Sequence, residues 1–376
     1  ETYDFIGDSD RSALSVEGVG FQGLASTDNS KLIPLALPLV NFSYETDPDR
    51  YGGRYFLNNN ALLLTRDIGS KTRRLSNIVG WRLPYITDGG QVVEFKTQLR
   101  GDLYNVSDVA LTNGKNYTGV TGRLVPEASA LWRYPFINQV SATSVILEPV
   151  VNVAVSPSGG NPEKIPNEDS LVPEFTDTNL FSDNRFAGYD RIEHGPRVSY
   201  GMRGLMNYRM FYLDGLFGQH YRLQEDHNFP FSNDLTDNLS DYVGKIGLQV
   251  NPLYIAYRFR LDKQTLTSRR KELDLQYSAR RLVLNSSYLK LENDPIFASR
   301  EEFTGTANVE ISKNWEVGMG IRRDLLIDQL TNFGGQLLFK NECVNVSGMI
   351  TREYMRDREV KPDTKYLVRL SLKNLN

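Results

Sequence analysis

Apolar and polar residues alternate with a period of two along most of this chain. Between positions 314 and 322, the odd-numbered residues from 315 are Trp, Val, Met and Ile, whereas the even-numbered residues from 316 are Glu, Gly, Gly and Arg. The segments 253–261 and 363–372 alternate in a similar way. Because successive side chains of a β-strand point to opposite faces, each segment predicts a strand with one apolar and one polar face.

The predicted strands are numerous and long. Further segments of this kind lie at 53–66, 71–84, 91–104, 121–135, 143–156, 196–208, 268–280 and 328–341. The whole chain carries about 18 strand candidates by this criterion. Strands of soluble proteins usually have about 5 or 6 residues, whereas a tilted membrane strand needs about 9–11. The longest apolar run, Leu32 to Val40, is too short for a membrane-spanning helix. We therefore predict an all-β fold, a large antiparallel transmembrane β-barrel of the outer-membrane type.

The predicted connections support this fold. Asn251 and Pro252 alone separate two strands, and residues 311–314 turn between two others, whereas residues 156–195 form a long polar connection. Short turns at one end and long loops at the other are typical of outer-membrane barrels. No linker interrupts the pattern, so residues 1–376 are expected to form one domain. A large soluble β-sandwich or β-helix, which also alternates, is the alternative.

The polar faces carry more charge than a solvent-exposed sheet needs. Arg100 and Asp102 are one such pair, and a barrel with this many strands encloses water or a partner. The candidate lumen-facing residues are Arg258, Arg260, Glu316 and Arg322.

Composition narrows the function. The chain has 43 basic and 46 acidic residues and a net charge of −3, which argues against a nucleic-acid binder. The three histidines lack metal-ligand spacing, no phosphate-binding loop is present, and no nucleophile–base pair stands out, so neither an enzyme nor a cofactor is expected. The carboxylate pairs Glu301/Glu302 and Asp237/Asp241 are interpreted as solvated charges, with calcium or magnesium contact as a secondary hypothesis. The first residues contain neither a signal peptide nor an initiating Met, so a fragment or a processed product is expected.

One loop carries a dense motif. Residues 177–191 read Asp-Thr-Asn-Leu-Phe-Ser-Asp-Asn-Arg-Phe-Ala-Gly-Tyr-Asp-Arg, and a predicted strand follows. This segment resembles the D-x-N-L-F-x-x-N-R-F-x-G-x-D-R signature of the LptD family, and the stretches 101–104, 132–136, 148–149 and 161–170 resemble its alphaproteobacterial members. The matching residues are Asp177, Asn179, Leu180, Phe181, Asn184, Arg185, Phe186, Gly188, Asp190 and Arg191. The loop either contacts substrate or a plug inside the barrel, or only fixes its own fold through its polar groups.

The resemblance implies a function and partners. The family moves lipopolysaccharide from a periplasmic bridge, an LptA-like protein, into the outer leaflet of the cell outer membrane, and an LptE-like lipoprotein plugs the barrel. An N-terminal domain and the first strands of the intact protein would then precede this chain. The lipid would leave through a seam, one lip of which would be the last strand with Tyr366, Val368, Leu370 and Leu372. A diffusion or ligand-gated channel remains the alternative function.

Cys343 is the one cysteine of the chain. The resemblance implies a disulfide to the N-terminal domain, because family members carry one or two cysteines near this position. A buried free thiol is the alternative, since lone cysteines are among the most buried residues.

Overall fold

The computed structural model describes residues 2–23, 28–171, 174–229, 235–294, 298–354 and 362–372. These residues form 20 strands and one short 3-10 helix, η1 (Ser30–Leu32). The first ten strands are β1 (Thr2–Asp8), β2 (Ser12–Gly20), β3 (Leu35–Glu45), β4 (Arg54–Thr65), β5 (Lys71–Ile86), β6 (Val92–Ala110), β7 (Asn116–Arg133), β8 (Phe136–Val140), β9 (Thr143–Val155) and β10 (Arg197–Tyr208). The others are β11 (Phe211–Arg222), β12 (Tyr242–Val250), β13 (Leu253–Leu261), β14 (Ser268–Ala279), β15 (Leu282–Asp294), β16 (Ala298–Glu310), β17 (Trp315–Asp324), β18 (Gln329–Lys340), β19 (Val344–Glu353) and β20 (Asp363–Leu372).

The predicted all-β antiparallel fold class is confirmed, and the strands are long as expected. The alternating segments 53–66 and 71–84 correspond to β4 and β5, and the segment 363–372 is β20. The described residues contain 20 strands where the sequence indicated about 18. β6 has 19 residues and β7 has 18, several times the length of a typical soluble strand. No helix in the described part of the chain is long and apolar enough to cross a membrane.

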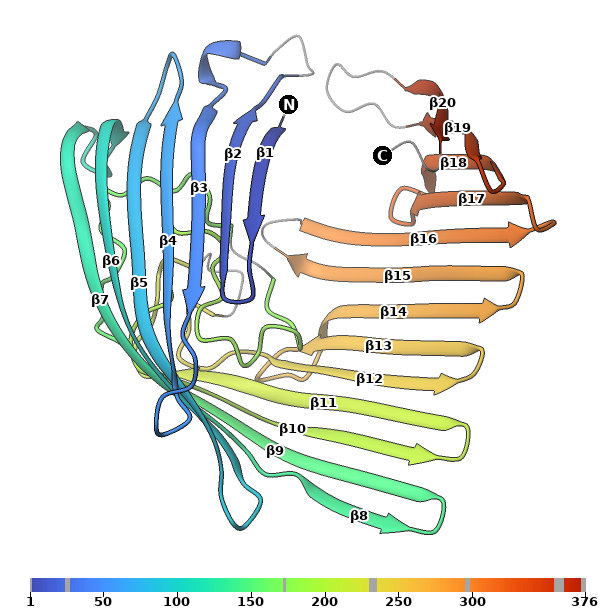
Figure 1. Cartoon of the computed structure of the whole chain (residues 1–376), viewed down its shortest axis with the longest axis horizontal. Coiled ribbons are helices and arrows are strands. Elements are labelled where there is room, and N and C mark those ends of the chain that lie inside the picture. Colours follow the sequence, from blue (N-terminus) through green and yellow to red (C-terminus); the bar gives the residue numbers. More distant parts are fainter. Residues whose placement is uncertain are drawn as a thin grey trace. The chain divides into compact units, whose positions relative to one another are not determined.

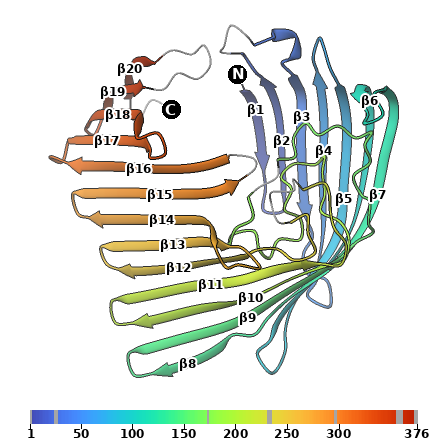
Figure 2. The same ribbon diagram turned by 180° about the vertical axis from the view of Figure 1, so that it is seen from behind.

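The chain divides into two compact units. The first comprises residues 1–135, 148–201 and 219–240, and the second comprises 136–147, 202–218 and 241–376. In the first unit each strand from β1 to β7 pairs with the next, and β7 also pairs with β9. These strands lie side by side in Figure 1. In the second unit each strand from β11 to β20 pairs antiparallel with the next. Figure 2 shows the hairpins of β12 to β17 from behind.

The two faces of the sheet in the first unit reverse the pattern of a soluble protein. On β5, Thr72, Arg74 and Ser76 are buried, whereas Leu75 between them is 46% exposed. On β7, Leu124 is 69% exposed. We call these the polar face and the apolar face. Apolar side chains that remain exposed over a whole face need a lipid environment, because water disfavours such a patch.

The second unit has the same two kinds of face. Arg258 of β13 lies opposite Glu272 of β14 and bonds to Asp274 on the polar face. Tyr257 and Leu273, which lie opposite each other on the apolar face, are 37% and 44% exposed. In both units, the alternation that predicted the strands therefore places charged side chains on one face of the sheet and apolar side chains on the other.

Candidate functional site

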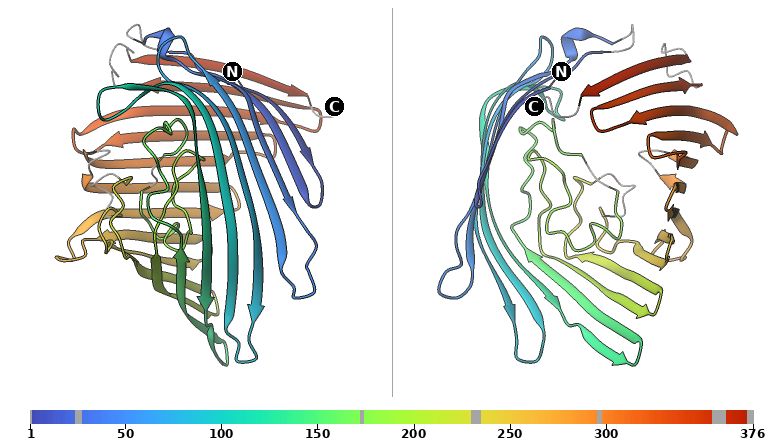
Figure 3. Two further views of the ribbon diagram at one scale, coloured as in Figure 1. Left: turned by 90° about the vertical axis from the view of Figure 1, so that its left-hand side faces the viewer. Right: turned by 45° about the vertical axis from the view of Figure 1, so that its right-hand side comes forward.

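The long connection between β9 and β10, residues 156–196, crosses the polar face of the first unit (Figure 3). We call it the signature loop, because it contains the 177–191 motif. Its described residues form no helix or strand. Phe175, Leu180 and Phe186 are nevertheless buried, and the Phe186 ring stacks on Phe229 with 4.5 Å between the ring centroids. The loop thus buries three apolar side chains, and Phe186 joins it to the segment that follows β11.

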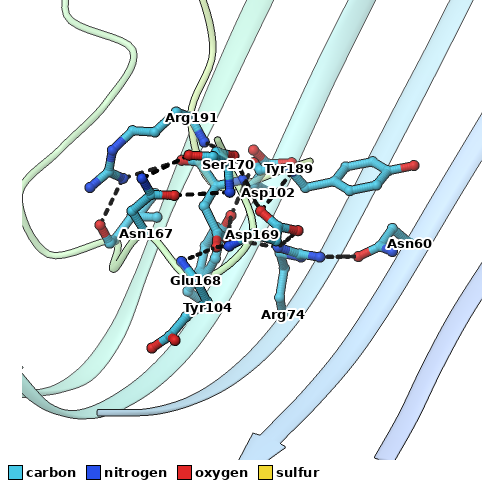
Figure 4. A network of polar contacts seen from close by, with 12 residues as sticks. Asn60, Arg74, Asp102, Tyr104, Asn167, Glu168, Asp169, Ser170, Tyr189 and Arg191 are labelled. Atoms are coloured by element: carbon cyan, nitrogen blue, oxygen red, sulfur yellow. Dashed lines mark hydrogen bonds and ion pairs between the residues drawn. The ribbon is translucent and has the colours of Figure 1, made fainter. Parts of the chain in front are cut away.

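Two aspartates of the loop, Asp169 and Asp190, bind each other's backbone and the sheet; Figure 4 labels Asp169 together with Arg74 of the sheet. The Asp190 carboxylate accepts hydrogen bonds from the backbone N–H groups of Glu168 and Asp169, at 2.8 and 3.1 Å. In return, the Asp169 carboxylate accepts from the backbone N–H groups of Tyr189 and Asp190, at 3.0 and 3.1 Å. These four hydrogen bonds join residues 168–169 to residues 189–190 and fix the position of one segment against the other.

The sheet contributes Arg74 and Tyr104 to this pair of aspartates. Arg74 of β5 lies 2.7 Å from both Asp169 Oδ2 and Asp190 Oδ1, and its side chain is 1% exposed. Tyr104 of β6 donates to Asp190 Oδ1 at 3.0 Å. Asn60 of β4 accepts from Arg74 Nε at 3.0 Å. Because each charge here has a partner of opposite sign, burial does not leave it uncompensated.

Two further arginines of the sheet bind the loop backbone. Arg123 of β7 donates to the carbonyl oxygens of Gly160 and Asp190, at 3.1 and 3.0 Å. Arg100 of β6 donates to the Tyr189 carbonyl oxygen. Asp102 pairs with both arginines and neutralises them. These two arginines thus hold the loop mainly through its backbone carbonyl oxygens, in addition to the side-chain contacts made by Arg74 and Tyr104.

A second charged cluster surrounds Glu193. Arg185 Nη1 lies 2.7 and 2.9 Å from the two carboxylate oxygens of Glu193, and neither side chain is exposed. Arg222, the last residue of β11, donates to Glu193 Oε1 at 2.6 Å. Arg222 also lies 3.2 Å from Asp226. This cluster joins the motif to the segment that follows β11.

A third contact fixes the middle of the motif. The Asp183 carboxylate accepts from Lys96 of β6 and Ser129 of β7, each at 3.1 Å, and from Asn152 of β9 at 3.0 Å. Arg197, the first residue of β10, donates to the Asp183 carbonyl oxygen at 3.1 Å and lies 2.6 Å from Glu127. The motif therefore contacts four strands through one residue, three through the Asp183 carboxylate and β10 through its carbonyl oxygen.

Two carboxylates of the loop, Glu193 and Asp169, are held in the ionised form, whereas burial raises the pKa of Asp190. Burial alone would raise the pKa of Glu193, but Arg185 and the His220 hydrogen bond hold it well below its ordinary value. Burial opposes ionisation of Asp169 too, and Arg74 with the Tyr189 backbone N–H lowers the pKa of that carboxyl. Both carboxylates are therefore charged anchors at neutral pH.

Ser199, His220 and Glu193 form a contact that the sequence did not indicate. Ser199 Oγ lies 2.9 Å from His220 Nδ1, and His220 Nε2 lies 3.5 Å from Glu193 Oε1. A serine hydrolase uses the two ring nitrogens in the opposite sense, with Nε2 at the serine. Ser199 is 3% exposed and accepts a hydrogen bond from Arg185 at 3.1 Å. The three residues therefore serve as part of the polar core that holds the loop.

The other predicted residues of the motif shape its turns. Asn179 accepts from the Thr176 backbone N–H at 3.0 Å and donates to the Glu174 carbonyl oxygen. Asn184 accepts from the Glu193 backbone N–H at 2.9 Å. Gly188 has φ +75°, in the left-handed region that favours glycine. Arg191 donates to the Ile165 carbonyl oxygen at 2.9 Å. Asp177 and Phe181 are half-buried. All ten predicted residues lie in one folded loop, and their contact with a substrate or a plug stays a prediction.

The remaining predicted residues lie in the second unit. Arg258 and Arg260 are on β13, and Arg260 is 2% exposed. Glu316 pairs with Lys340 at 3.3 Å, and Arg322 lies 3.0 Å from Glu302. The candidate seam residues of β20, Tyr366, Val368, Leu370 and Leu372, share one face and are exposed. All four predicted polar residues lie on the polar face, and their exposure to a lumen stays a prediction.

Cys343 is a free and exposed thiol in the turn before β19. The alternative of a buried thiol is wrong, because the turn is stabilised by the Asn341 side chain, which accepts from the Cys343 backbone N–H at 2.9 Å and leaves the thiol outside. The disulfide to a segment outside this chain stays a prediction.

The carboxylate pairs are occupied by basic or hydroxyl partners. Glu302 lies 2.8 Å from Arg300, and Glu301 accepts from the Tyr288 hydroxyl at 2.8 Å. Asp241 is buried 3.5 Å from Arg269. Among the residues that the structure describes, no group of three His, Cys, Asp or Glu side chains could hold a metal ion.

Sequence reasoning missed most of the sheet's half of the site. It named Arg100 and Asp102 as polar-face residues but missed Arg74 and Arg123 of the sheet and Glu193 of the loop. Arg74 and Arg123 stand at alternate positions within apolar strands, which was a usable signal. Their partners could not be found, because Asp190 lies 116 residues from Arg74 along the chain.

A long antiparallel sheet with charged groups buried on one face and hydrocarbon exposed on the other defines an outer-membrane type of β-protein. The family model described as "LptD: LPS transport system D" matches residues 2–316. The chain therefore belongs to the LptD family of lipopolysaccharide-transport proteins and is located in the outer membrane. The match includes the signature loop and ends within β17.

Comparisons with solved structures give matches of low identity. The siderophore receptor PiuA from Acinetobacter baumannii is 11% identical, with 100% of this chain and 73% of that chain covered and a TM-score of 0.46. A variant of the ferric enterobactin receptor PfeA from Pseudomonas aeruginosa is 9% identical, with 98% and 69% covered and a TM-score of 0.48. The FrpB iron transporter from Neisseria meningitidis is 8% identical, with 98% and 70% covered and a TM-score of 0.48. No curated protein matches the chain.

Proposed function

We propose that this chain conducts lipopolysaccharide into the outer leaflet of the outer membrane, with the sugar-bearing head along the polar face and the acyl chains released sideways. The observation that carries the proposal is the separation of the two faces within single strands, such as buried Arg74 beside exposed Leu75 on β5. Lipopolysaccharide is proposed as the transported molecule because the chain belongs to the LptD family.

Lipopolysaccharide has a polar part and an apolar part, as the sheet has a polar face and an apolar face. A charged, hydroxylated head is costly to place in hydrocarbon, and acyl chains are costly to leave in water. A wall with one polar and one apolar face solves both problems, provided that the tails can pass from one side to the other. A closed barrel has no free strand edge, so this passage needs a seam.

β20 is the proposed lip of the seam in this chain. Its residues Tyr366, Val368, Leu370 and Leu372 form an apolar face, with exposures from 51% to 77%. On the other side of the strand lie Lys365 and Arg369, which pair with Thr351 and Ser347 of β19. A strand of this kind can meet hydrocarbon on one side and a charged head on the other.

The signature loop is the proposed fixed wall of the pathway. Its three charged clusters hold it on the polar face from β5 to β11, so it presents one shape to whatever passes. An LptE-like lipoprotein plug and an LptA-like periplasmic bridge are the proposed partners, and residues 1–376 would act as one β-domain with them.

Photo-crosslinking in cells tests this function. A photoreactive residue at Arg322 on the polar face is compared with one at Val317 on the apolar face of the same strand. A lipopolysaccharide adduct at Arg322 that disappears when the periplasmic bridge is depleted is the expected result. Labelling of Val317 alone, unaffected by that depletion, would mark surrounding lipid and favour a diffusion or ligand-gated channel instead.

A further inference from the structure

An uncharged row crosses nine strands of the second unit. The antiparallel register places one residue of each strand from β11 to β19 directly opposite the next, on the polar face. The members of this row are Tyr212, Gln249, Tyr254, Gln276, Asn285, Thr306, Gly320, Gly334 and Thr351. We call it the neutral row. Adjacent strands lie about 4.8 Å apart, so the row extends for roughly 38 Å.

Charged residues lie on both sides of the neutral row. Two residues further along the strands toward the long loops, the same face carries Asp214, Asp274, Arg322 and Glu353. Toward the short turns it carries Glu310, Glu316 and Arg369. A band without charge is thus set within a charged face, and it does not attract an ionic ligand by its own residues.

The neutral row is also hollowed. One hollow of about 260 Å³ is lined by Tyr254, Gln276, Asn285 and Thr306 of the row, and Asp274 of the adjoining charged positions also belongs to its lining. A second, of about 250 Å³, is lined by Thr306, Asn308, Gln336 and Thr351 and has Gly320 and Gly334 in its lining. The two hollows share Thr306. Each is smaller than the roughly 300–1,000 Å³ of a drug-sized site, which suits a single ring of a chain of linked units.

The side chains of the row supply the chemistry of carbohydrate recognition. Amides and hydroxyls both donate and accept, as sugar hydroxyls do, and tyrosine rings offer an apolar surface to a sugar ring. Two hydrogen bonds of the row are long, since Asn285 donates to Thr306 at 3.3 Å and Gln276 donates to Ser278 at 3.4 Å. Gln249, near one end of the row, donates to Asn251 at the ordinary distance of 3.0 Å. The charged neighbours are held more tightly, with Arg300 2.8 Å from Glu302. The part of the row around Gln276 and Asn285 can therefore exchange its own hydrogen bonds for those of a ligand at little cost.

We propose that the neutral row is a track for the uncharged sugars of the transported glycolipid. The inference rests on the proposed function, since it names the part of the cargo that this face would contact. Sugars bound by single hydrogen bonds on an open sheet are held weakly, because each bond contributes only modestly after competition with water. Weak and repeated contact suits a molecule that must move on.

Two crosslinking positions on the polar face and a third on the apolar face separate this inference from the proposed function. In the intact protein, a photoreactive residue is placed at Thr306 of the neutral row, at Arg322 of the charged row, or at Gly305 on the apolar face. Cells make either lipopolysaccharide with its full sugar chain or lipopolysaccharide truncated to its acylated glucosamine disaccharide. We expect Thr306 to label the full glycolipid and to lose most of that labelling with the truncated form, while Arg322 labels both.

A larger side chain at Gly334, which lines the second hollow, can be compared with the same substitution at Gly348 on the apolar face. A Cβ added at Gly334 meets nothing within 4 Å, and the same holds for Gly348 on the opposite face of the neighbouring strand. Gly334→Leu is expected to reduce labelling at Thr306 by about fivefold, the effect of losing one hydrogen bond. Gly348→Leu should leave it unchanged, and gel mobility without heating reports whether each variant has folded.

Equal labelling of Thr306 by the full and the truncated glycolipid would overturn the inference, because the sugars would then not be what the row contacts. A protein adduct at Thr306 would also overturn it, in favour of a plug that covers the row. In both cases retained labelling of Arg322 would leave the proposed function standing, whereas loss of bridge-dependent labelling at Arg322 would remove that function itself.

Discussion

Arg185 and Glu193 face each other inside the signature loop, with Nη1 2.7 and 2.9 Å from the two carboxylate oxygens and with neither side chain exposed. A pair so placed adds little net stability when it is intact, because desolvation offsets the attraction. The pair instead specifies one conformation of the loop, since any other conformation would leave Arg185 or Glu193 buried without a partner of opposite charge. The docked loop is thus a fixed element of the polar face.

Arg185→Ala should release the loop. The substitution leaves Glu193 buried with one fewer partner, which costs about 3–5 kcal/mol when a buried pair is broken. Limited proteolysis of the purified protein in detergent should then cut within residues 156–196 much faster than in the wild type. The control is Arg323→Ala, which removes an exposed pair with Asp328 and should cost at most about 1 kcal/mol. Equal cleavage rates in the two variants would contradict the anchoring role.

Gly188→Ala should disturb the same loop for a different reason. Gly188 has φ +75°, and a Cβ there would lie 2.5 Å from both the carbonyl oxygen and Oδ1 of Asp169. At Gly159, φ is +83° but a Cβ would meet nothing within 4 Å, so Gly159→Ala carries only the backbone strain, about 1–2 kcal/mol. Hydrogen exchange of residues 165–195 should rise more in the Gly188 variant. A larger rise in the Gly159 variant would show that contact with Asp169 is unimportant.

The loop should stay docked in mild acid. The pKa of Glu193 is held below its ordinary value of 4.5 in the folded protein. Its stabilising contribution is therefore complete above pH 4.5 and is lost only as the pH falls through the depressed folded-state pKa. Proteolysis of the loop by an acid-tolerant protease should be constant from pH 7 to pH 5 and should increase only well below pH 4. Glu193→Gln, which does not titrate, should lose the part of this transition that Glu193 contributes, while Asp169, whose pKa is also lowered, still titrates. A wild-type transition near pH 6 would refute the assignment.

Leu124→Arg should impair folding in the membrane. Leu124 is 69% exposed on the apolar face of β7, and an arginine on a lipid-facing position near the bilayer midplane costs about 2–4 kcal/mol. The folded fraction, measured by gel mobility without heating, should fall. Leu326 is 52% exposed in the turn after β17, so Leu326→Arg should have little effect. If both variants fold equally well, the apolar face does not meet hydrocarbon.

The state of Cys343 can be measured directly. The thiol is exposed, so a maleimide reagent should label it fully in the reduced protein. In the intact protein taken from cells without reductant, we expect protection, because the predicted disulfide would join Cys343 to a segment outside this chain. Full labelling without reductant would rule the disulfide out.

The sequence by itself determined the strands and their two faces. The alternation around Met319 or Tyr257 is local, because each residue of a strand takes the face opposite to that of its neighbour. The motif from Asp177 to Arg191 likewise identified the loop, because its turns are made by nearby residues such as Asn179 and Gly188.

Only the tertiary structure decided which groups meet. Arg74 reaches Asp190 across 116 residues, and nothing in the local pattern of β5 chooses that partner. The neutral row depends on register over nine strands, and a shift of one residue in any pairing would break it. The local sequence determines which face of the sheet a side chain occupies. Its partner is determined by the pairing of distant strands, because a buried charge is stable only beside a charge of opposite sign.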